Sequence, residues 1–401
     1  MTETTPRGNQ EEHIPSHKSG RYSNLVKIIT WICRIICGGL FIFSGFVKAI
    51  DPWGTLFKIE EYLNAFGVPM PFAILRLIVF GLCAVEFIVG CFLLMGCFRK
   101  SCPVFSCLIM AFMLPLTLWI AMENPVADCG CFGDALIISN WATFWKNVVL
   151  TVGIVWLIRY NISAFCLISP AFQWLAVVAS GLFIVLIELI GFFQQPLIDF
   201  RDYKVGSSLF AQSEGEASHG IDVFDIDSLD DKTEDAQQSE GKELVVMIPK
   251  VSMVSPGTTW KLNSLYEWAQ DNGVKMIGIV SGSTEEIEQW EDLSMASYPV
   301  YLADDSEIKE VVRGNPGVVY LDNGKIIWKS TLNAIDIDDF LAPQVSADAT
   351  TFEKDNTTTL RNLIFIYLIV IVFLIFISFT PRMAQLLTRG GLASKRGVRH
   401  H

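Results

Sequence analysis

The chain has 401 residues, of which 51% are hydrophobic and only 18% charged, yet its formal net charge is −12. Soluble domains carry about 25% charged residues, so a single soluble globule is excluded. The charge is divided unevenly: residues 197–360 hold 31 acidic and 12 basic side chains, a balance of −19, and the remainder carries +7. A basic, apolar membrane part is therefore joined to an acidic, water-soluble part. A nucleic-acid binder, which needs a basic surface, is also excluded.

Six stretches are long and apolar enough to cross a bilayer, which takes about 20 residues of helix. Their predicted limits are 25–47, 72–98, 102–122, 142–158, 171–193 and 363–379. Residues 1–24 form a polar leader and residues 380–401 a basic tail. The first apolar stretch is too long for the core of a signal peptide, so we expect it to remain as a helix.

Lysine and arginine gather in the leader, in the second-to-third and fourth-to-fifth connections, and in the tail. Positive charge marks the cytoplasmic side of a membrane protein, so six spans place both termini in the cytoplasm. The acidic part and the loops 48–71 and 123–141 then lie outside. We expect a multi-pass protein of a bacterial inner membrane, surrounded by lipids, with its acidic part in the periplasm.

The loop 123–141 contains Cys129 and Cys131, separated by one glycine and flanked by Asp128 and Asp134. A Cys-Gly-Cys sequence closes a tight, exchangeable disulfide, and the glycine permits the sharp turn of that ring. An inert pair and half of a metal site are the alternatives. A metal site needs histidine or further cysteine nearby, which the loop lacks, so we assign no metal ligands. The other eight cysteines lie mostly in the spans, where we expect them to act as small apolar side chains.

Arg34 and Glu86 are ionisable groups inside predicted spans, where a charge is costly and calls for a partner or a function. Each lies roughly 15 Å from the cytoplasmic end of its span, at a rise of about 1.5 Å per residue. Equal depth on antiparallel neighbours predicts an Arg34–Glu86 ion pair. The pair would either clamp two helices or contribute to binding of a ligand or quinone.

The run from Arg34 to Lys48, followed by Asp51, resembles the first helix of the DoxX family, in which an arginine opens the span and a Gly-x-x-Lys motif closes it. Cys129 and Cys131, with the Phe-Gly after them, resemble the related MauE branch of methylamine-utilisation membrane proteins. The resemblance covers about residues 25–160. It implies a four-helix membrane bundle linked to thiol or disulfide chemistry. It also makes a quinone the one cofactor to consider, because DoxX-like proteins act beside sulfur and quinone oxidoreduction.

Residues 203–345 alternate short apolar runs with amphipathic ones, which predicts an α/β domain centred on parallel strands. The predicted strands are 243–249, 275–281, 298–303, 317–321 and 325–329, and the predicted helices are 258–272, 284–293 and 306–313. An Asn-Gly turn joins the last two strands as a hairpin. Residues 211–241 are acidic and poor in large apolar side chains, which indicates a surface insertion. Residues 346–360 form a polar linker to the last span.

This order of elements, with Asn315-Pro316 before the closing hairpin, resembles the thioredoxin-like fold, in which Pro316 would be the cis-proline. Ser252 and Ser255 stand where that family has its Cys-x-x-Cys. Hydroxyls form no disulfide, so we expect this domain to bind or position a client rather than to exchange thiols. Ser255 followed by proline also suits the start of a helix. Helix capping and a client groove are thus the two interpretations of the serines.

Together these features predict six spans with a DoxX-like four-helix core and a periplasmic thioredoxin-like domain. The predicted function is envelope thiol–disulfide or electron-transfer chemistry through Cys129 and Cys131. An unidentified envelope protein would be its client or redox partner. The rival is a non-catalytic membrane scaffold or assembly factor that binds such a partner. Whether the chain is an enzyme stays open.

Overall fold

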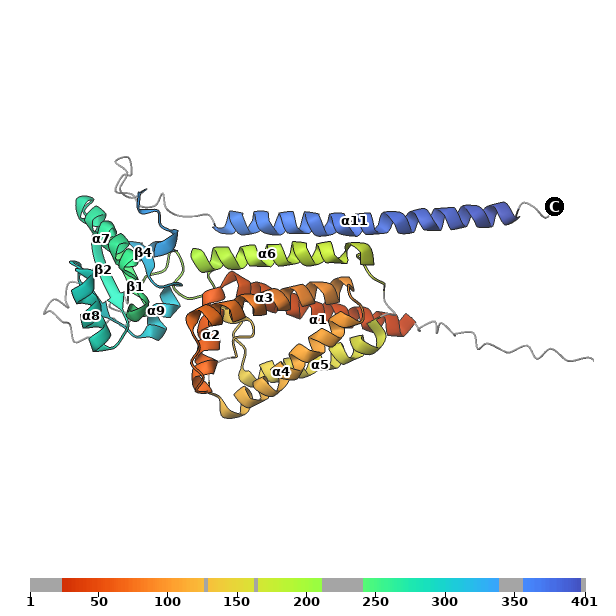
Figure 1. The fold of residues 1–401 in the computed structure, drawn as a ribbon, viewed down its shortest axis with the longest axis horizontal. Helices are drawn as coiled ribbons and strands as arrows, with labels where there is room; N and C mark the ends of the chain where they lie inside the picture. The colour runs from red at the N-terminus through yellow and green to blue at the C-terminus, as the bar shows by residue number, and fades with distance from the viewer. Residues whose placement is uncertain (1–23, 126–128, 162–164, 211–240, 339–355, 398–401) are drawn as a thin grey trace, which may run out of the picture.

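The computed structural model of the chain describes residues 24–125, 129–161, 165–210, 241–338 and 356–397. Asp128 lies outside these ranges. So do the predicted leader and acidic insertion, apart from the last residue of each, and most of the predicted linker. The described residues form a bundle of long helices and a separate α/β domain beyond one end of it (Figure 1).

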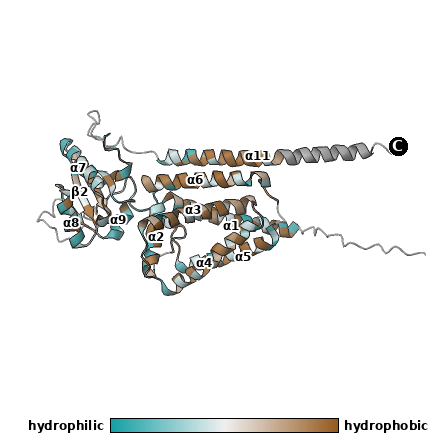
Figure 2. Ribbon diagram, viewed as in Figure 1, coloured by the Kyte–Doolittle hydropathy of each residue, from teal (hydrophilic) through white to brown (hydrophobic). Residues whose placement is uncertain are grey.

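Six helices are long and apolar enough to cross a membrane, and they coincide with the six predicted spans. They are α1 (Asn24–Ile50), α3 (Phe72–Met95), α4 (Ser101–Glu123), α5 (Asn140–Tyr160), α6 (Gln173–Phe193) and α11 (Asn356–Gly397). Apolar residues predominate along α1, α3, α4, α5, α6 and residues 356–379 of α11 (Figure 2), and large apolar side chains such as Leu77 and Phe112 are exposed on the outer faces of these helices. α11 begins before the predicted span, so the end of the predicted linker is helical.

α1 and α3 pack with their backbones in contact. A Cβ atom at Gly45 would lie 2.5 Å from the backbone nitrogen of Phe87, and one at Gly90 would lie 2.5 Å from that of Ile42. Small residues at a helix crossing permit this close approach in membranes. The contact fixes which residues of the two helices face each other.

A further helix, α2 (Pro52–Ala65), lies between the bundle and the α/β domain (Figure 1) and was not predicted. Asp51 caps its start, because its Oδ1 accepts a hydrogen bond of 2.9 Å from the nitrogen of Gly54. Pro52 occupies the first helical position, where its missing N–H is harmless. α2 contacts the loop that carries Cys129 and Cys131 and forms one wall of the cavity beside Ser252.

The α/β domain has a mixed five-stranded sheet, and every predicted strand and helix of this region is present. The strands are β1 (Lys242–Ile248), β2 (Lys275–Val280), β3 (Val300–Leu302), β4 (Gly317–Asp322) and β5 (Lys325–Thr331), in the order β3-β2-β1-β4-β5. β1, β2 and β3 are parallel, whereas β4 is antiparallel to both of its neighbours. The helices are α7 (Pro256–Asp271), α8 (Thr284–Ser294) and α9 (Asp305–Val311). α7 and α8 cover one face of the sheet and α9 the other. The Asn315–Pro316 peptide bond is cis, as predicted.

Candidate functional site

Cys129 and Cys131 lie in the loop between α4 and α5, with their Sγ atoms 3.1 Å apart. Gly130 between them has a φ of +61°, in the left-handed region that favours glycine. The sharp turn expected for Cys-Gly-Cys is therefore present. The sulfurs of these two free thiols are about 1 Å farther apart than in a disulfide, whose bond is roughly 2.0 Å long.

Three helices hold this loop in place. Tyr62 on α2 donates a hydrogen bond of 2.7 Å from its Oη to the carbonyl oxygen of the first cysteine. Ser44 on α1 has its Oγ 2.7 Å from the carbonyl oxygen of the second. Lys146 on α5 places its Nζ 4.1 Å from the centre of the Phe132 ring, within the range of a cation–π interaction. The thiols are thus fixed relative to the bundle.

The two thiols differ in acidity. The pKa of Cys131 is lowered to about 6, first because the Cys129 thiol donates a hydrogen bond to it. The positive charges of Lys146 and Lys48 lower it further, against the opposing effect of burial. The pKa of Cys129 is raised by the same hydrogen bond and by burial. Cys131 is therefore the thiolate of the pair, and the thiolate is the nucleophile in disulfide exchange.

A buried ion pair adjoins the thiol loop. Lys48 Nζ lies 2.8 Å from Glu86 Oε1 and 2.9 Å from Oε2, and both side chains are only 6% exposed. Ser44 Oγ lies 2.7 Å from Glu86 Oε2, which links the pair to the loop. A cavity of about 40 Å³ lies among Cys131, Lys146 and the ion pair. That volume has room for one or two water molecules.

The predicted Arg34–Glu86 ion pair is wrong. Arg34 instead donates from Nε to the side-chain oxygen of Asn161 at 2.7 Å, and from Nη2 to its carbonyl oxygen at 2.8 Å. Its Nη1 donates to the carbonyl oxygen of Phe165 at 2.7 Å. The buried guanidinium is satisfied by amide and carbonyl oxygens, so it needs no carboxylate from α3.

The register of α1 against α3 explains this difference. Arg34 lies against Gly96, at the end of α3, whereas Ser44 lies opposite Glu86. α1 begins well beyond the end of α3, so equal distance from the predicted ends does not give equal depth. Lys48, quoted in the sequence only as part of a motif, is the residue that pairs with Glu86.

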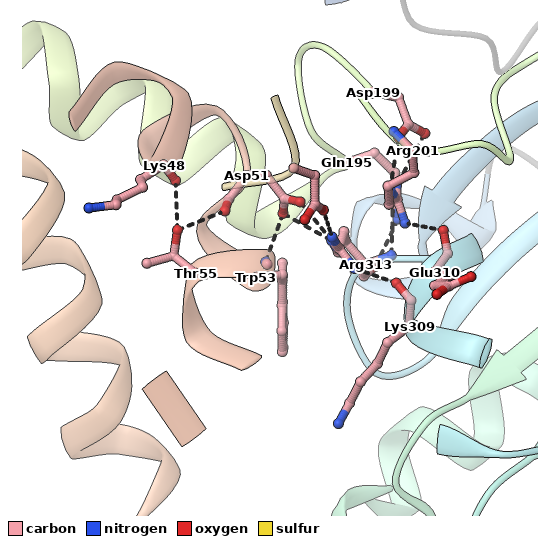
Figure 3. Close-up of polar contacts among 12 residues, drawn as sticks. Lys48, Asp51, Trp53, Thr55, Gln195, Asp199, Arg201, Lys309, Glu310 and Arg313 are labelled. Carbon is pink, nitrogen blue, oxygen red and sulfur yellow. Dashed lines mark hydrogen bonds and ion pairs between the residues drawn. The ribbon is translucent and has the colours of Figure 1, made fainter. Parts of the chain in front are cut away.

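Arg313 joins the α/β domain to the bundle, and the sequence analysis missed it. Its Nε lies 2.8 Å from Asp51 Oδ2 (Figure 3), and its Nη2 pairs with Asp134 of the thiol loop. Gln195 donates a hydrogen bond of 2.8 Å to its carbonyl oxygen. Burial alone would lower the pKa of Arg313, but the two carboxylates raise it above its ordinary value. Asp51 and Asp134, both noted in the sequence, therefore bind Arg313 and hold the α/β domain against the bundle. The sequence did contain a signal for this contact, since Arg313 is a basic residue in a strongly acidic region, three positions before the predicted cis-proline.

A second charged cluster lies beside Arg313 in the segment that leads into the domain (Figure 3). Asp199 pairs with Arg201 at 2.8 Å and also with Lys329 of β5. Burial and repulsion from Arg201 lower the pKa of Lys329 to about 7. Burial would raise the pKa of Asp199, but the two cations lower it overall. These contacts hold the incoming segment against the sheet.

The serines of the α/β domain have separate positions. Ser255 caps α7, because its Oγ accepts a hydrogen bond of 3.3 Å from the nitrogen of Thr258, which confirms the capping interpretation. Ser252 and Asn315, next to the cis-proline, line a cavity of about 320 Å³ whose opposite wall is α2. The predicted degenerate site thus faces the bundle. In the described part of the chain, no three His, Cys, Asp or Glu side chains are grouped to hold a metal ion.

Residues 26–160 match the sequence profile of the family described as methylamine utilisation protein MauE. The matched region runs from α1 to α5 and includes the thiol loop, Lys48 and Glu86. No curated protein and no solved structure shows significant similarity to the chain. The N-terminal helices are therefore a MauE-like membrane segment.

Proposed function

Because its N-terminal helices are MauE-like, we propose that the protein carries out thiol–disulfide exchange through Cys129 and Cys131 on an envelope client. The observation that carries this proposal is the 3.1 Å approach of the two sulfurs beside two buried or half-buried lysines. A thiolate next to a cation and a second thiol is the arrangement that exchange requires. The periplasmic location of the loop and the inner membrane remain predictions from charge.

In the proposed reaction the Cys131 thiolate attacks one sulfur of a client disulfide. A mixed disulfide forms, and the client's other sulfur leaves as a thiolate. Cys129 then loses its proton and attacks Cys131 Sγ, which closes the Cys129–Cys131 bond and releases the client's second sulfur. The client gains two electrons and two protons, and the loop is oxidised to a disulfide. The reverse sequence oxidises a client dithiol.

The α/β domain would position the client. The order β2-β1-β4-β5 with a cis-proline before β4 supports the thioredoxin-like interpretation of this domain. Its cavity of about 320 Å³ combines the aromatic side chain of Phe57 with the charged groups of Glu60, Lys250 and Glu286. A groove of mixed character suits an extended peptide. Arg313 keeps this groove next to the thiol loop.

A quinone is the predicted partner for the electrons of the loop. A cavity of about 380 Å³ between α1, α3, α6 and α11 is lined by Phe46, Phe87, Phe183 and Tyr367. Its walls are almost entirely apolar, which suits a quinone ring dissolved in a bilayer.

Two observations favour the alternative of a non-catalytic scaffold. Cys129 is only 9% exposed, and the domain that would present a client is held against the bundle by a buried ion pair. If the loop never opens, the thiols only stabilise the fold and the protein acts by binding an envelope partner.

A redox titration of the full chain in membranes separates the two functions. Samples equilibrated at a series of thiol–disulfide potentials are quenched with acid, denatured and labelled with a mass-tagging maleimide. Exchange predicts that the tags on Cys129 and Cys131, assigned by peptide, are lost together in one two-electron transition, and that Cys129→Ser or Cys131→Ser abolishes that transition. A pair that stays reduced, or stays oxidised, at every physiological potential contradicts the proposal. Cys129→Ser retains the attacking thiol and should accumulate mixed disulfides with clients, whereas Cys131→Ser should not.

A further inference from the structure

A second pair of cysteines meets at the end of the bundle away from the α/β domain. Cys97 follows α3, and Cys166 lies in the connection from α5 to α6. The two segments are hydrogen-bonded to each other, because the nitrogen of Leu167 donates to the carbonyl oxygen of Met95 at 3.0 Å. Nothing in the sequence indicated this proximity: the two cysteines are 69 residues apart, and only Cys97 lies in a predicted span, where we expect an apolar filler.

Gln173 on α6 bridges the two segments. Its Oε1 accepts a hydrogen bond of 3.1 Å from the nitrogen of Phe98, and its Nε2 lies 3.4 Å from Cys166 Sγ. A hydrogen bond between the Cys97 and Cys166 thiols is the first cause of the opposite pKa shifts of the two groups, and Cys166 Sγ also lies 2.8 Å from the carbonyl oxygen of Ile168. Both side chains are buried. The two sulfurs are therefore neighbours inside the protein, held there by backbone and side-chain contacts.

Cationic groups adjoin this pair, as they adjoin the thiol loop. Arg34 is fixed by Asn161 and by the carbonyl oxygen of the residue before Cys166. Asn161 in turn donates a hydrogen bond of 2.9 Å to the carbonyl oxygen of Arg99. The hydrogen bond from Cys97 lowers the pKa of Cys166 to about 6, with Arg99 adding to the effect and burial opposing it. Arg34, whose predicted carboxylate partner is absent, thus belongs to this second cluster.

We propose that Cys97 and Cys166 are a second redox-active thiol pair, which interconverts between a dithiol and a disulfide. The reaction partner is a small disulfide, R–S–S–R. Cys166 attacks it and releases one RS⁻, and Cys97 then loses its proton and attacks Cys166 Sγ to release the second. Two electrons and two protons leave with the two RSH molecules, and a bond between Cys97 and Cys166 joins the α3–α4 turn to the α5–α6 connection.

The two thiol pairs act separately. The first lies beside Ser44 of α1 and the second beside Arg34, which places them about 15 Å apart along the helix at a rise of roughly 1.5 Å per residue. Sulfur atoms at that distance cannot exchange directly. The second pair therefore has its own potential, whatever the fate of the Cys129–Cys131 proposal.

The test uses the full chain carrying Cys129→Ser and Cys131→Ser, so that only the second pair responds. The purified protein is equilibrated with oxidised and reduced dithiothreitol at fixed ratios, quenched with acid, denatured and labelled with the mass-tagging maleimide. We expect two tags to be lost together over one range of potential, with a linked peptide that contains Cys97 and Cys166. Adding Cys97→Ser should abolish the loss, whereas Cys102→Ser, at a buried cysteine of α4 nearby, should leave the transition in place.

Two tags retained at every ratio would overturn the proposal, as would a disulfide that the reduced reagent never opens in the folded protein. A linked peptide that joins Cys166 to a different cysteine would also overturn it. Should the background variant fail to fold, differential alkylation of the unmodified chain, measured peptide by peptide, answers the same question. Cys129 and Cys131 are either replaced or assigned to their own peptides. A negative result for Cys97 and Cys166 is therefore distinguishable from a negative result for exchange through Cys129 and Cys131.

Discussion

The thiol loop and the serine site of the α/β domain are both built against α2, yet in the proposed function they carry opposite halves of one kind of chemistry. The loop has two sulfurs and adjacent cations but no sheet, groove or cis-proline of its own. The serine site has the helix start, the cis-proline and a groove but no cysteine among the residues that line it. The difference shows that a fold's geometry does not supply thiol reactivity. Thiol reactivity depends on the sulfur atoms and on the charges around them. In this protein both are found at the thiol loop between α4 and α5.

The largest effect should come from separating the two sites. Arg313→Ala leaves Asp51 buried without its partner, which typically destabilises a protein by about 3–5 kcal/mol. We expect the α/β domain to detach, with faster tryptic cleavage near the 195–205 segment and altered fluorescence of Trp53. The matched control is Lys250→Ala, since its 3.7 Å pair with Glu60 is exposed and worth under about 1 kcal/mol. Equal effects of the two substitutions would argue against docking through Arg313.

The next largest effect concerns the buried ion pair below the loop. Glu86→Gln leaves Lys48 charged and unpaired, so we expect a loss of about 3 kcal/mol or more in the free energy of unfolding in detergent. Adding Lys48→Met should restore part of that loss. Adding Arg34→Gln should not, because Arg34 bonds to Asn161 instead. Rescue by Arg34→Gln rather than by Lys48→Met would mean that the helix register is different.

A smaller effect is expected in the pH dependence of the loop. With a pKa of about 6, Cys131 should react with iodoacetamide on the order of ten times faster at pH 7 than at pH 5, and little faster above pH 8. Cys129→Ala removes the hydrogen bond that contributes most to this shift. The midpoint should therefore rise toward the ordinary value of about 8.5, which lowers reactivity at pH 7. An unchanged midpoint would show that the lysines alone set the acidity.

The smallest effect tests the serine site. Ser255→Ala removes the cap of α7 and should destabilise the α/β domain by about 1 kcal/mol, without changing the redox titration of the loop. Ser252→Ala, at a residue that lines the groove, should leave stability within about 0.5 kcal/mol. Reduced client trapping in Ser252→Ala at unchanged stability would sharpen the comparison by giving the groove a binding role. A changed reduction potential of Cys129 and Cys131 in Ser252→Ala would contradict the separation of the two sites.

The elements with a regular pattern were predictable from the sequence. Six apolar stretches, alternating strands and the Asn-Gly turn all have local signals, and the structure contains each of them. α2 was missed although Asp51-Pro52 is a capping signal, because its 14 residues lie in a loop between two predicted spans, where no helix was sought. Side-chain partners were not predictable, because Arg313 meets Asp51 across a long stretch of chain and Glu86 meets Lys48 only in one register. Such pairings depend on distances between elements, which no local pattern contains.

The backbone contact between α1 and α3 has a consequence for the loop chemistry. Gly45 is next to Ser44, and an added methyl group there would have to push α3 away at Phe87. Glu86 would move with it, and the 2.7 Å contacts that connect the carboxylate, the hydroxyl and the carbonyl of Cys131 would lengthen together. We therefore expect the acidity of the half-buried Cys131 thiol to depend on a residue that has no side chain. Gly45→Ala changes no charge and touches no sulfur, yet it should alter the loop's potential as much as a substitution of a lysine beside it.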